Sequence, residues 1–221
     1  MKPTLLTTLS ILLFALTTYF PLAFTQDIEK VKDTNGNPLV PGAKYYIWQT
    51  TTSGQKGGGL MLGLSGGTIT PCPLTVIQEF CGDDIDDGSP VIFNVTDGGD
   101  VILEDLSNVE IEFDKKPDCA QSSKWVMVQN EDYFHTTWIS IGSFQDPSDD
   151  IQIINGVFKI KKQGLGYKLV FFSKGTYFDI KRFNDVLGRR LVTEDTIIDP
   201  YHYHPFEVKF VNANRYRRSV V

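Results

Sequence analysis

Hydrophobic and polar residues alternate along much of this chain in short runs separated by turn-forming residues. The clearest runs are Val109-Glu110-Ile111-Glu112-Phe113 and Phe206-Glu207-Val208-Lys209-Phe210, in which every second residue is apolar. This period of two places the apolar side chains on one face of an extended strand. Similar β-branched and aromatic runs predict strands at Tyr45–Trp48, Leu60–Leu64, Thr75–Gln78, Pro90–Val95, Val109–Phe113, Trp125–Val128, Val157–Lys161, Tyr167–Phe172, Phe178–Phe183, Arg190–Thr193 and Phe206–Val211.

Clusters of Gly, Asp, Asn, Ser and Pro separate these runs, and no segment after the N-terminus carries an apolar stripe of helical period. Many short strands at regular spacing are typical of a barrel or a sandwich. The pattern therefore predicts an all-β protein. Periodicity alone leaves a closed barrel and an immunoglobulin-like sandwich open.

The first 25 residues have the composition of an export signal. Lys2 gives a positive start, Leu5–Leu16 is almost entirely apolar, and Ala23 and Thr25 are the small residues of a cleavage site before Gln26. The apolar stretch falls short of the roughly 20 residues that span a bilayer, although an uncleaved anchor is the alternative. We predict a signal peptide over residues 1–25, no membrane segment in the mature form, and one domain over residues 26–221.

Removing 25 residues from 221 leaves 196, and the loss of Lys2 changes the formal charge from −6 to −7. A chain of this length fits one domain with a sizeable core. Its acidity argues against a nucleic acid partner, because phosphate binding needs a basic face. The basic cluster Arg215, Arg217 and Arg218 is interpreted as a solvated tail, with a sorting or binding element as the alternative.

Several of these segments together resemble the plant Kunitz protease inhibitors, the soybean trypsin inhibitor family. Val31–Ile47 resembles the opening signature of the family, with Asp33, the run Gly36–Leu39 and an aromatic strand. Cys72–Gln78 and Tyr167–Phe171 are similar to two further family strands. The resemblance implies a β-trefoil, which is a six-stranded barrel closed by three hairpins with pseudo-threefold symmetry.

The same resemblance implies a disulfide between Cys72 and Cys119, which match the first bridge of the family. Three cysteines in a secreted chain leave one over when a single bridge forms, and Cys81 has no counterpart in the family pattern. The second bridge of the family has no equivalent, because Phe172–Thr176 contains no cysteine.

No residue cluster in the sequence has the spacing of a catalytic or metal site. Asp199 with His202 and His204 offers fewer ligands than a zinc site needs, and His135 stands apart. The acidic run 83–88 lacks the regular oxygen spacing of a calcium loop, and Gly57–Gly59 lacks the Lys of a phosphate loop and is predicted to be a mobile hairpin. We expect no enzyme activity, no metal and no cofactor.

Family inhibitors insert an extended segment between the fourth and fifth strands into the cleft of a protease. An ungapped count from Cys72 places the specificity residue at Thr96, and the candidate reactive loop is Phe93, Asn94, Val95, Thr96 and Asp97. The loop has no Lys or Arg for the acidic pocket of trypsin, whereas Phe93 would suit a chymotrypsin-like pocket and Thr96 an elastase-like one.

Two further departures affect this loop. Pro41 replaces the Asn that braces the loop in the soybean inhibitor. Asn94-Val95-Thr96 is a glycosylation sequon, so we predict a glycan on Asn94, which would obstruct a protease cleft.

The resemblance implies a secreted plant-defence inhibitor of proteases, with a serine protease other than trypsin as the first expected partner. The expected location is the extracellular space or apoplast, or the vacuole by way of the secretory pathway, and the expected state is a monomer. The alternative is a non-inhibitory storage protein or a carbohydrate- or protein-binding β-trefoil, since a fold does not fix a function.

Overall fold

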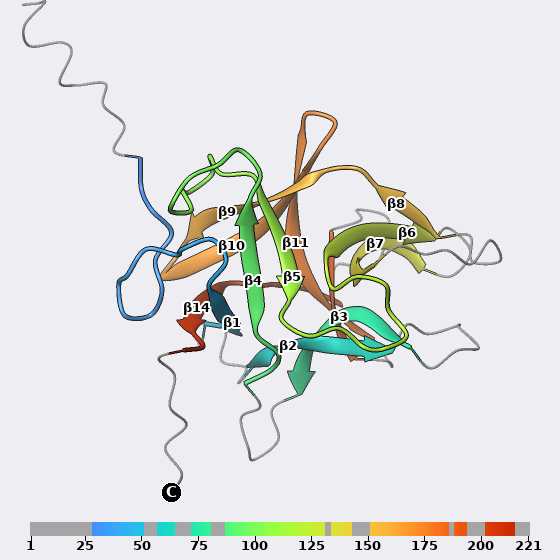
Figure 1. Ribbon diagram of the computed structural model, residues 1–221. Helices are drawn as coiled ribbons and strands as arrows, with labels where there is room; N and C mark the ends of the chain where they lie inside the picture. Colours follow the sequence, from blue (N-terminus) through green and yellow to red (C-terminus); the bar gives the residue numbers. More distant parts are fainter. Residues whose placement is uncertain are drawn as a thin grey trace, which may run out of the picture.

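A computed structural model describes residues 28–50, 57–64, 72–80, 87–130, 134–142, 151–185, 188–193 and 202–214. These residues form fourteen β-strands (Figure 1), which confirms the all-β prediction. Within them, no helix is long and apolar enough to cross a membrane.

Six strands close a barrel. Each pairs antiparallel with two neighbours, in the cyclic order β1, β4, β5, β9, β10, β14 and back to β1. Their bounds are β1 Lys44–Gln49, β4 Val91–Val95, β5 Val109–Phe113, β9 Val157–Gln163, β10 Gly166–Ser173 and β14 Val208–Asn212. A closed ring has no unpaired edge, so the barrel satisfies its own backbone hydrogen bonds.

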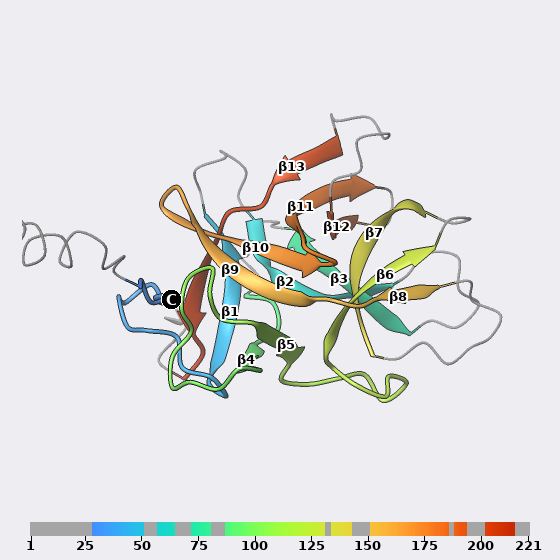
Figure 2. The ribbon, with the colours of Figure 1, turned by 90° about the horizontal axis from the view of Figure 1, so that it is seen from above.

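Three hairpins lie at one end of this barrel. They are β2 (Gly57–Leu64) with β3 (Pro73–Phe80), β6 (Trp125–Asn130) with β7 (Phe134–Ile141), and β11 (Thr176–Asp185) with β12 (Gly188–Thr193). The inner strands β3, β7 and β12 all pair with one another. Two short strands, β8 (Gln152–Ile154) and β13 (Tyr203–Pro205), extend the hairpins at β6 and β11. Seen from above in Figure 2, β1, β4 and β14 lie on the opposite side of the molecule from β6, β7 and β8.

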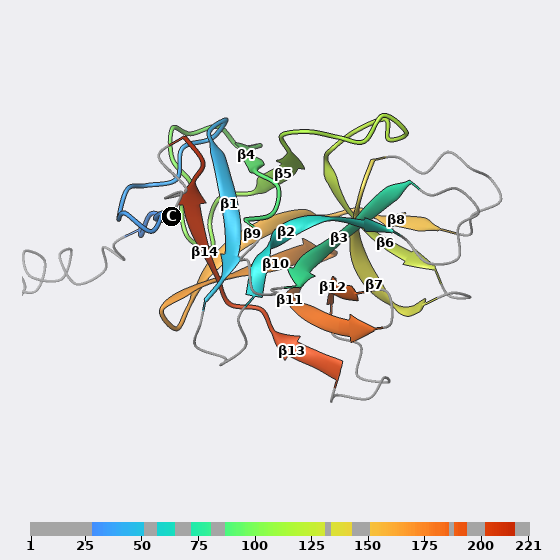
Figure 3. The same ribbon diagram turned by 90° about the horizontal axis from the view of Figure 1, so that it is seen from below.

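This pairing is the β-trefoil that the sequence predicts. Each third of the chain gives two strands to the barrel and one hairpin to the cap, and in the view from below β2 and β3 cross beneath the barrel (Figure 3).

The core follows from the alternation of the strands. In β5 the apolar residues of Val109–Phe113 are buried and the two glutamates are half-buried. Aromatic rings fill the barrel: Phe93 meets Phe210 edge-on with ring centroids 5.4 Å apart, and Trp125 meets Phe158 at 6.1 Å. Edge-to-face pairs of this kind add about 0.5–1.5 kcal/mol each to the gain from burial.

Strand β7 has no counterpart among the predicted runs. Its sequence FHTTWISI places polar residues on the buried side, so it lacks a continuous apolar face. Thr136 and Ser140 are buried, and their hydroxyls donate to the carbonyls of Thr193 at 2.8 Å and Leu74 at 2.9 Å. Hydrogen bonds to neighbouring hairpins therefore replace the hydrophobic signal on which the sequence analysis depended.

The glycines Gly57–Gly59, predicted as a mobile hairpin, begin strand β2 of the β2–β3 hairpin, and their mobility stays a prediction. The backbone of Asp87 lies against Gly59, where a Cβ atom would overlap the Asp87 carbonyl oxygen. The indole of Trp48 donates to the same oxygen at 3.0 Å. Glycine is needed here because the backbones of two segments approach closely.

The disulfide between Cys72 and Cys119 is confirmed, with Cα atoms 6.0 Å apart and a sequence separation of 47. It joins the start of β3 in the first third to the β5–β6 connection in the second third.

A buried polar cluster joins the barrel to two of the hairpins. Arg182 of β11 donates to Gln49 Oε1 at 3.0 Å and to Gln78 Oε1 at 2.9 Å, and Gln78 donates to Gln49 at 2.9 Å. Burial, followed by repulsion from Arg189, lowers the pKa of Arg182 to about 10. The guanidinium still carries its charge at neutral pH and is held by amide oxygens, so it links strands β1, β3 and β11.

Several predictions fall outside the described residues. They concern the signal peptide at 1–25, the fate of Cys81, the acidic residues Asp83, Asp84 and Asp86, the possible ligand Asp199, and the basic cluster Arg215, Arg217 and Arg218.

Candidate functional site

The connection between β4 and β5, residues 96–108, lies at the upper end of the barrel in Figure 1, as the β10–β11 hairpin does. The two strands pair in unbroken register from Val91 with Phe113 to Val95 with Val109. The loop therefore starts and ends on neighbouring strands of a closed barrel, which is a rigid base for a binding segment.

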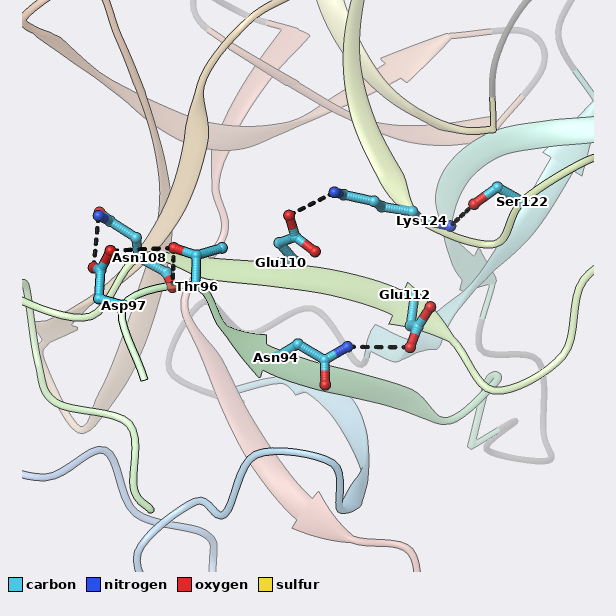
Figure 4. Close-up of polar contacts among 8 residues, drawn as sticks. All are labelled: Asn94, Thr96, Asp97, Asn108, Glu110, Glu112, Ser122 and Lys124. Atoms are coloured by element: carbon cyan, nitrogen blue, oxygen red, sulfur yellow. Dashed lines mark hydrogen bonds and ion pairs between the residues drawn. The ribbon is translucent and has the colours of Figure 1, made fainter. Parts of the chain in front are cut away.

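The first part of the connection, Thr96–Asp100, is an exposed tip. The Thr96 amide donates to the Asn108 carbonyl at 3.0 Å, and the Asn108 side chain donates to Asp97 Oδ2 at 2.7 Å (Figure 4). Gly98 and Gly99 then turn the chain with φ angles of +77° and +131°. Residues with a Cβ atom rarely adopt these angles, so the two glycines make the tip a turn instead of an extended strand.

The second part of the connection returns against the N-terminal segment. Ile102 is fully buried; its amide donates to the Leu39 carbonyl at 3.1 Å, and its carbonyl accepts from Val31 at 2.9 Å. Two residues later, the Glu104 amide donates to the Glu29 carbonyl at 2.9 Å. These backbone bonds hold the second part of the connection against the N-terminal segment, in which Pro41 offers no side-chain hydrogen-bond donor.

Asp105 and Leu106 attach the connection to β9. The Lys159 ammonium donates to the carbonyls of Asp105 at 3.1 Å and Leu106 at 3.2 Å, and Lys161 forms an ion pair with Asp105 at 2.9 Å. Asp105 has a φ angle of +58°, a left-handed conformation that Asp tolerates better than most residues. The connection is thus held by two lysines on one side and by the N-terminal segment on the other.

The whole β4–β5 unit is acidic. Residues 91–113 contain six Asp and Glu and no Lys, Arg or His. Burial, and then repulsion from Glu29, raises the pKa of Glu104, and Lys162 and Lys32 oppose this shift. A partner that binds here meets negative charge, which favours a partner surface that is neutral or basic.

The predicted reactive residues separate into two groups. Phe93, Asn94 and Val95 belong to strand β4, whereas Thr96 and Asp97 lie in the exposed tip. Phe93 is fully buried against Phe210, so the expectation that it could enter a chymotrypsin-like pocket is wrong. Asn94 and Val95 are half-buried, and the exposed part of the predicted loop begins at Thr96.

Asn94 lies on the outer side of β4, where its amide nitrogen donates to Glu112 Oε1 at 3.1 Å (Figure 4). A glycan on this nitrogen would leave it one N–H and would extend from the wall of the barrel, two residues before the tip. Glycosylation of Asn94 stays a prediction.

The sequence indicated the Gly98-Gly99 turn but missed the residues that hold the tip and the end of the connection, namely Asn108, Lys159 and Lys161. Counting forward from Cys72 crosses the β3–β4 connection, and any difference in the length of that connection shifts the result. The alternating strand Val109–Phe113 gives a nearer reference point, and counting back from it includes the Gly98-Gly99 turn in the loop.

The histidine cluster does not form a metal site in the part of the chain that is described, where no three His, Cys, Asp or Glu residues gather. His204 lies on β13 opposite Arg182. Burial, and then repulsion from Arg182 and His202, lowers its pKa, which leaves it a neutral side chain at physiological pH.

A closed β-trefoil holds this anchored loop on a rigid base, which is a scaffold suited to presenting a binding segment. The profile of the legume Kunitz family, described as "Trypsin and protease inhibitor", matches residues 31–211. The chain belongs to this family. A "Kunitz-type trypsin inhibitor-like 2 protein" of Pisum sativum is 40% identical over 96% of this chain and 94% of its own length. The "Subtilisin inhibitor CLSI-II" of Canavalia lineata is 34% identical over 88% of this chain and 97% of its own.

Solved structures show the same fold. A Kunitz-type trypsin inhibitor from Cicer arietinum has a TM-score of 0.71 and 38% identity, over 84% of this chain and 99% of that one. Soybean trypsin inhibitor in complex with porcine pancreatic trypsin has a TM-score of 0.67 and 25% identity, over 84% of this chain and 99% of that one. The family therefore includes proteins that form complexes with serine proteases.

Proposed function

We propose that this protein is a secreted inhibitor of serine proteases that do not select Lys or Arg, and that the β4–β5 connection is its reactive segment. The observation that carries the proposal is the composition of an anchored loop: its exposed tip, Thr96–Asp100, contains small, polar and acidic residues and no cation. A pocket with an acidic floor gains a charge-assisted hydrogen bond from Arg or Lys and gains none from these residues.

The anchoring of the loop supports an inhibitory role. A segment that is held before binding loses little conformational entropy in the complex, and this saving is a main source of affinity in preorganised binders. The bonds from Leu39, Glu29, Lys159 and Lys161 hold the return of the loop, and Asn108 holds the tip. These bonds hold the loop although position 41 is Pro41 and not the bracing Asn of the soybean inhibitor. This supports inhibition through a modified loop. The Canavalia lineata relative supports subtilisin-like proteases as the first class to test.

Secretion forms part of the same proposal, with residues 1–25 as the signal peptide and residues 26–221 as one domain. A disulfide between Cys72 and Cys119 supports folding in an oxidising compartment. We further propose that the protein acts as an inhibitor without enzyme activity of its own, and that a glycan on Asn94 limits which proteases can approach the tip.

The test is an inhibition panel of subtilisin-, elastase-, chymotrypsin- and trypsin-like proteases with the secreted protein. We expect inhibition of a protease with a small or apolar specificity pocket and weak or absent inhibition of trypsin. Thr96→Arg should improve trypsin inhibition. Because that change also removes the sequon, Thr96→Ala controls for the loss of the glycan, and Thr96→Ser keeps both the sequon and the small side chain. Nanomolar inhibition of trypsin by the unmodified protein would contradict the proposal.

A further inference from the structure

A second surface feature lies apart from the tip of the β4–β5 loop. The N-terminal segment, the β9–β10 hairpin and strand β14 enclose a half-open cavity of about 480 Å³. It is lined by Lys32, Asp33, Thr34, Gly36, Thr50, Lys162, Leu165, Gly166, Tyr167 and Lys209. Its size is within the usual range for small-molecule sites, about 300–1,000 Å³.

The cavity is basic although the protein is acidic. Lys32, Lys162 and Lys209 contribute three ammonium groups, and among the residues that the structure describes none of the three forms an ion pair. Instead, Lys162 Nζ lies 4.4 Å from the centre of the Tyr167 ring, and Lys209 Nζ lies 5.8 Å from that of Trp48. Aromatic faces thus hold two of the cations without neutralising their charge.

Two acidic groups beside the cavity, Asp33 and Glu207, accept hydrogen bonds from backbone amides. The Asp33 carboxylate accepts from the amides of Asn35 and Asn37, both at 2.9 Å, inside its own turn. Glu207 accepts from the Gly166 amide at 2.8 Å. A third carboxylate, Glu104, accepts from the Tyr167 hydroxyl and interacts with the charges of Lys162 and Lys32, which lower its pKa. Lys162 and Lys32 therefore share this carboxylate without forming an ion pair with it, and Lys209 adds a further positive group to the lining.

The rim of the cavity is apolar. Leu165 stands at the tip of the β9–β10 hairpin with 84% of its surface exposed. The Tyr167 ring forms part of the wall, and its hydroxyl accepts from the Lys32 amide at 2.9 Å, which fixes the ring in place. A ligand that covers Leu165 needs an apolar body, and one that satisfies the lysines needs a negative charge.

We propose that this cavity binds a small amphipathic anion, that is, a sulfate, sulfonate, phosphate or carboxylate group attached to an aromatic or aliphatic body. The anion lies among Lys32, Lys162 and Lys209, and the apolar body lies against Leu165 and Tyr167. The proposal does not depend on protease inhibition, because the lining residues and the exposed tip Thr96–Asp100 have no member in common.

The test is isothermal titration calorimetry of the full secreted protein with three probes: naphthalene-2-sulfonate, inorganic sulfate and 2-naphthol. We expect naphthalene-2-sulfonate to bind more tightly than either of the others, because only this probe carries both the charge and the apolar body. Lys162→Gln and Lys209→Gln should each weaken its binding by about fivefold or more, the loss expected for one charge-assisted contact. Leu165→Ser should weaken naphthalene-2-sulfonate and leave sulfate unchanged.

Lys168→Gln is the matched control, because Lys168 of β10 pairs with Asp179 at 2.6 Å and does not line the cavity. Thermal unfolding of each variant shows that it is folded. Three results would overturn the proposal: no binding of any probe to the folded protein, equal affinity for naphthalene-2-sulfonate and 2-naphthol, or a loss in Lys168→Gln as large as that in Lys162→Gln.

Discussion

Replacing Phe93 tests whether this aromatic residue supports the barrel or contacts a protease. The Phe93 ring is fully buried, with centroids 5.4 Å from Phe210 and 6.1 Å from Tyr45. Phe93→Ala removes these contacts and leaves a cavity between strands that cannot collapse, because the ring of strands is closed. Substitutions of this kind cost about 3–5 kcal/mol of unfolding free energy.

For a domain of this size, each kcal/mol corresponds to a shift of about 2–4 °C in Tm, so Phe93→Ala should lower Tm by about 6–20 °C. Urea unfolding should show a lower midpoint with an unchanged slope, which is the sign of a pure loss of stability. Thr96→Ala is the matched control, since an exposed loop substitution changes stability by less than about 0.5 kcal/mol.

The burial of Phe93 also predicts how inhibition should respond to its replacement. At a temperature where Phe93→Ala is still folded, its inhibition constants should stay close to those of the original protein, because the ring does not reach the surface. A Phe93→Ala protein that loses under about 1 kcal/mol of stability and at the same time loses inhibition of a chymotrypsin-like protease would refute this placement.

Four further changes test other parts of the structure. Asn108→Ala removes the 2.7 Å bond to Asp97, so it should weaken protease inhibition while costing only about 0.5–1.5 kcal/mol of stability in urea unfolding; unchanged inhibition would show that the bond does not organise the tip. Replacing Cys72 and Cys119 together by Ser should cost about 3–4 kcal/mol, whereas Cys81→Ser should be neutral; non-reducing peptide mapping that finds Cys81 bridged would contradict this. Glu104→Gln should stabilise the protein at pH 7, because the raised pKa of Glu104 means that folding disfavours its carboxylate. The gain should vanish as the pH falls below 4.5, where the unfolded chain also holds the proton. A gain that does not change with pH would argue against this cause. Gly59→Ala should cost several kcal/mol or prevent folding, because its Cβ atom would overlap the Asp87 carbonyl, and near-native stability would mean that the two backbones can separate.

The alternation of residues predicted most of the barrel because burial there depends on side chains that are plainly apolar. Val109–Phe113 and Phe206–Val211 show this: the core face can be read directly from every second residue. Strand β7 escaped prediction because Thr136 and Ser140 are buried through hydrogen bonds to other hairpins, and those partners are distant in sequence.

The candidate site was predicted less well for a different reason. The sequence proposed residues 93–97 as the reactive loop, and in a linear reading Phe93 and Thr96 look equally accessible. Only the pairing of β4 with β5 shows that the strand continues through Val95 and that the exposed tip begins at Thr96. The contribution of Lys159 and Lys161 also depends on tertiary contact, since nothing near residue 160 in the sequence indicates that it lies beside residue 105.

The closure of the barrel by β14 affects how the protein must fold during synthesis. This strand pairs with β1, in a register that joins Tyr45 to Asn212, and with β10 through Tyr167 and Val208. Contacts so distant in sequence form slowly, because much of the chain must be ordered before they contribute. Until β14 leaves the ribosome, the edges of β1 and β10 that will receive it are open to pairing with other chains. The period of greatest aggregation risk therefore lasts until β14 has been synthesised, and chaperones that cover those two edges should determine the yield of native protein.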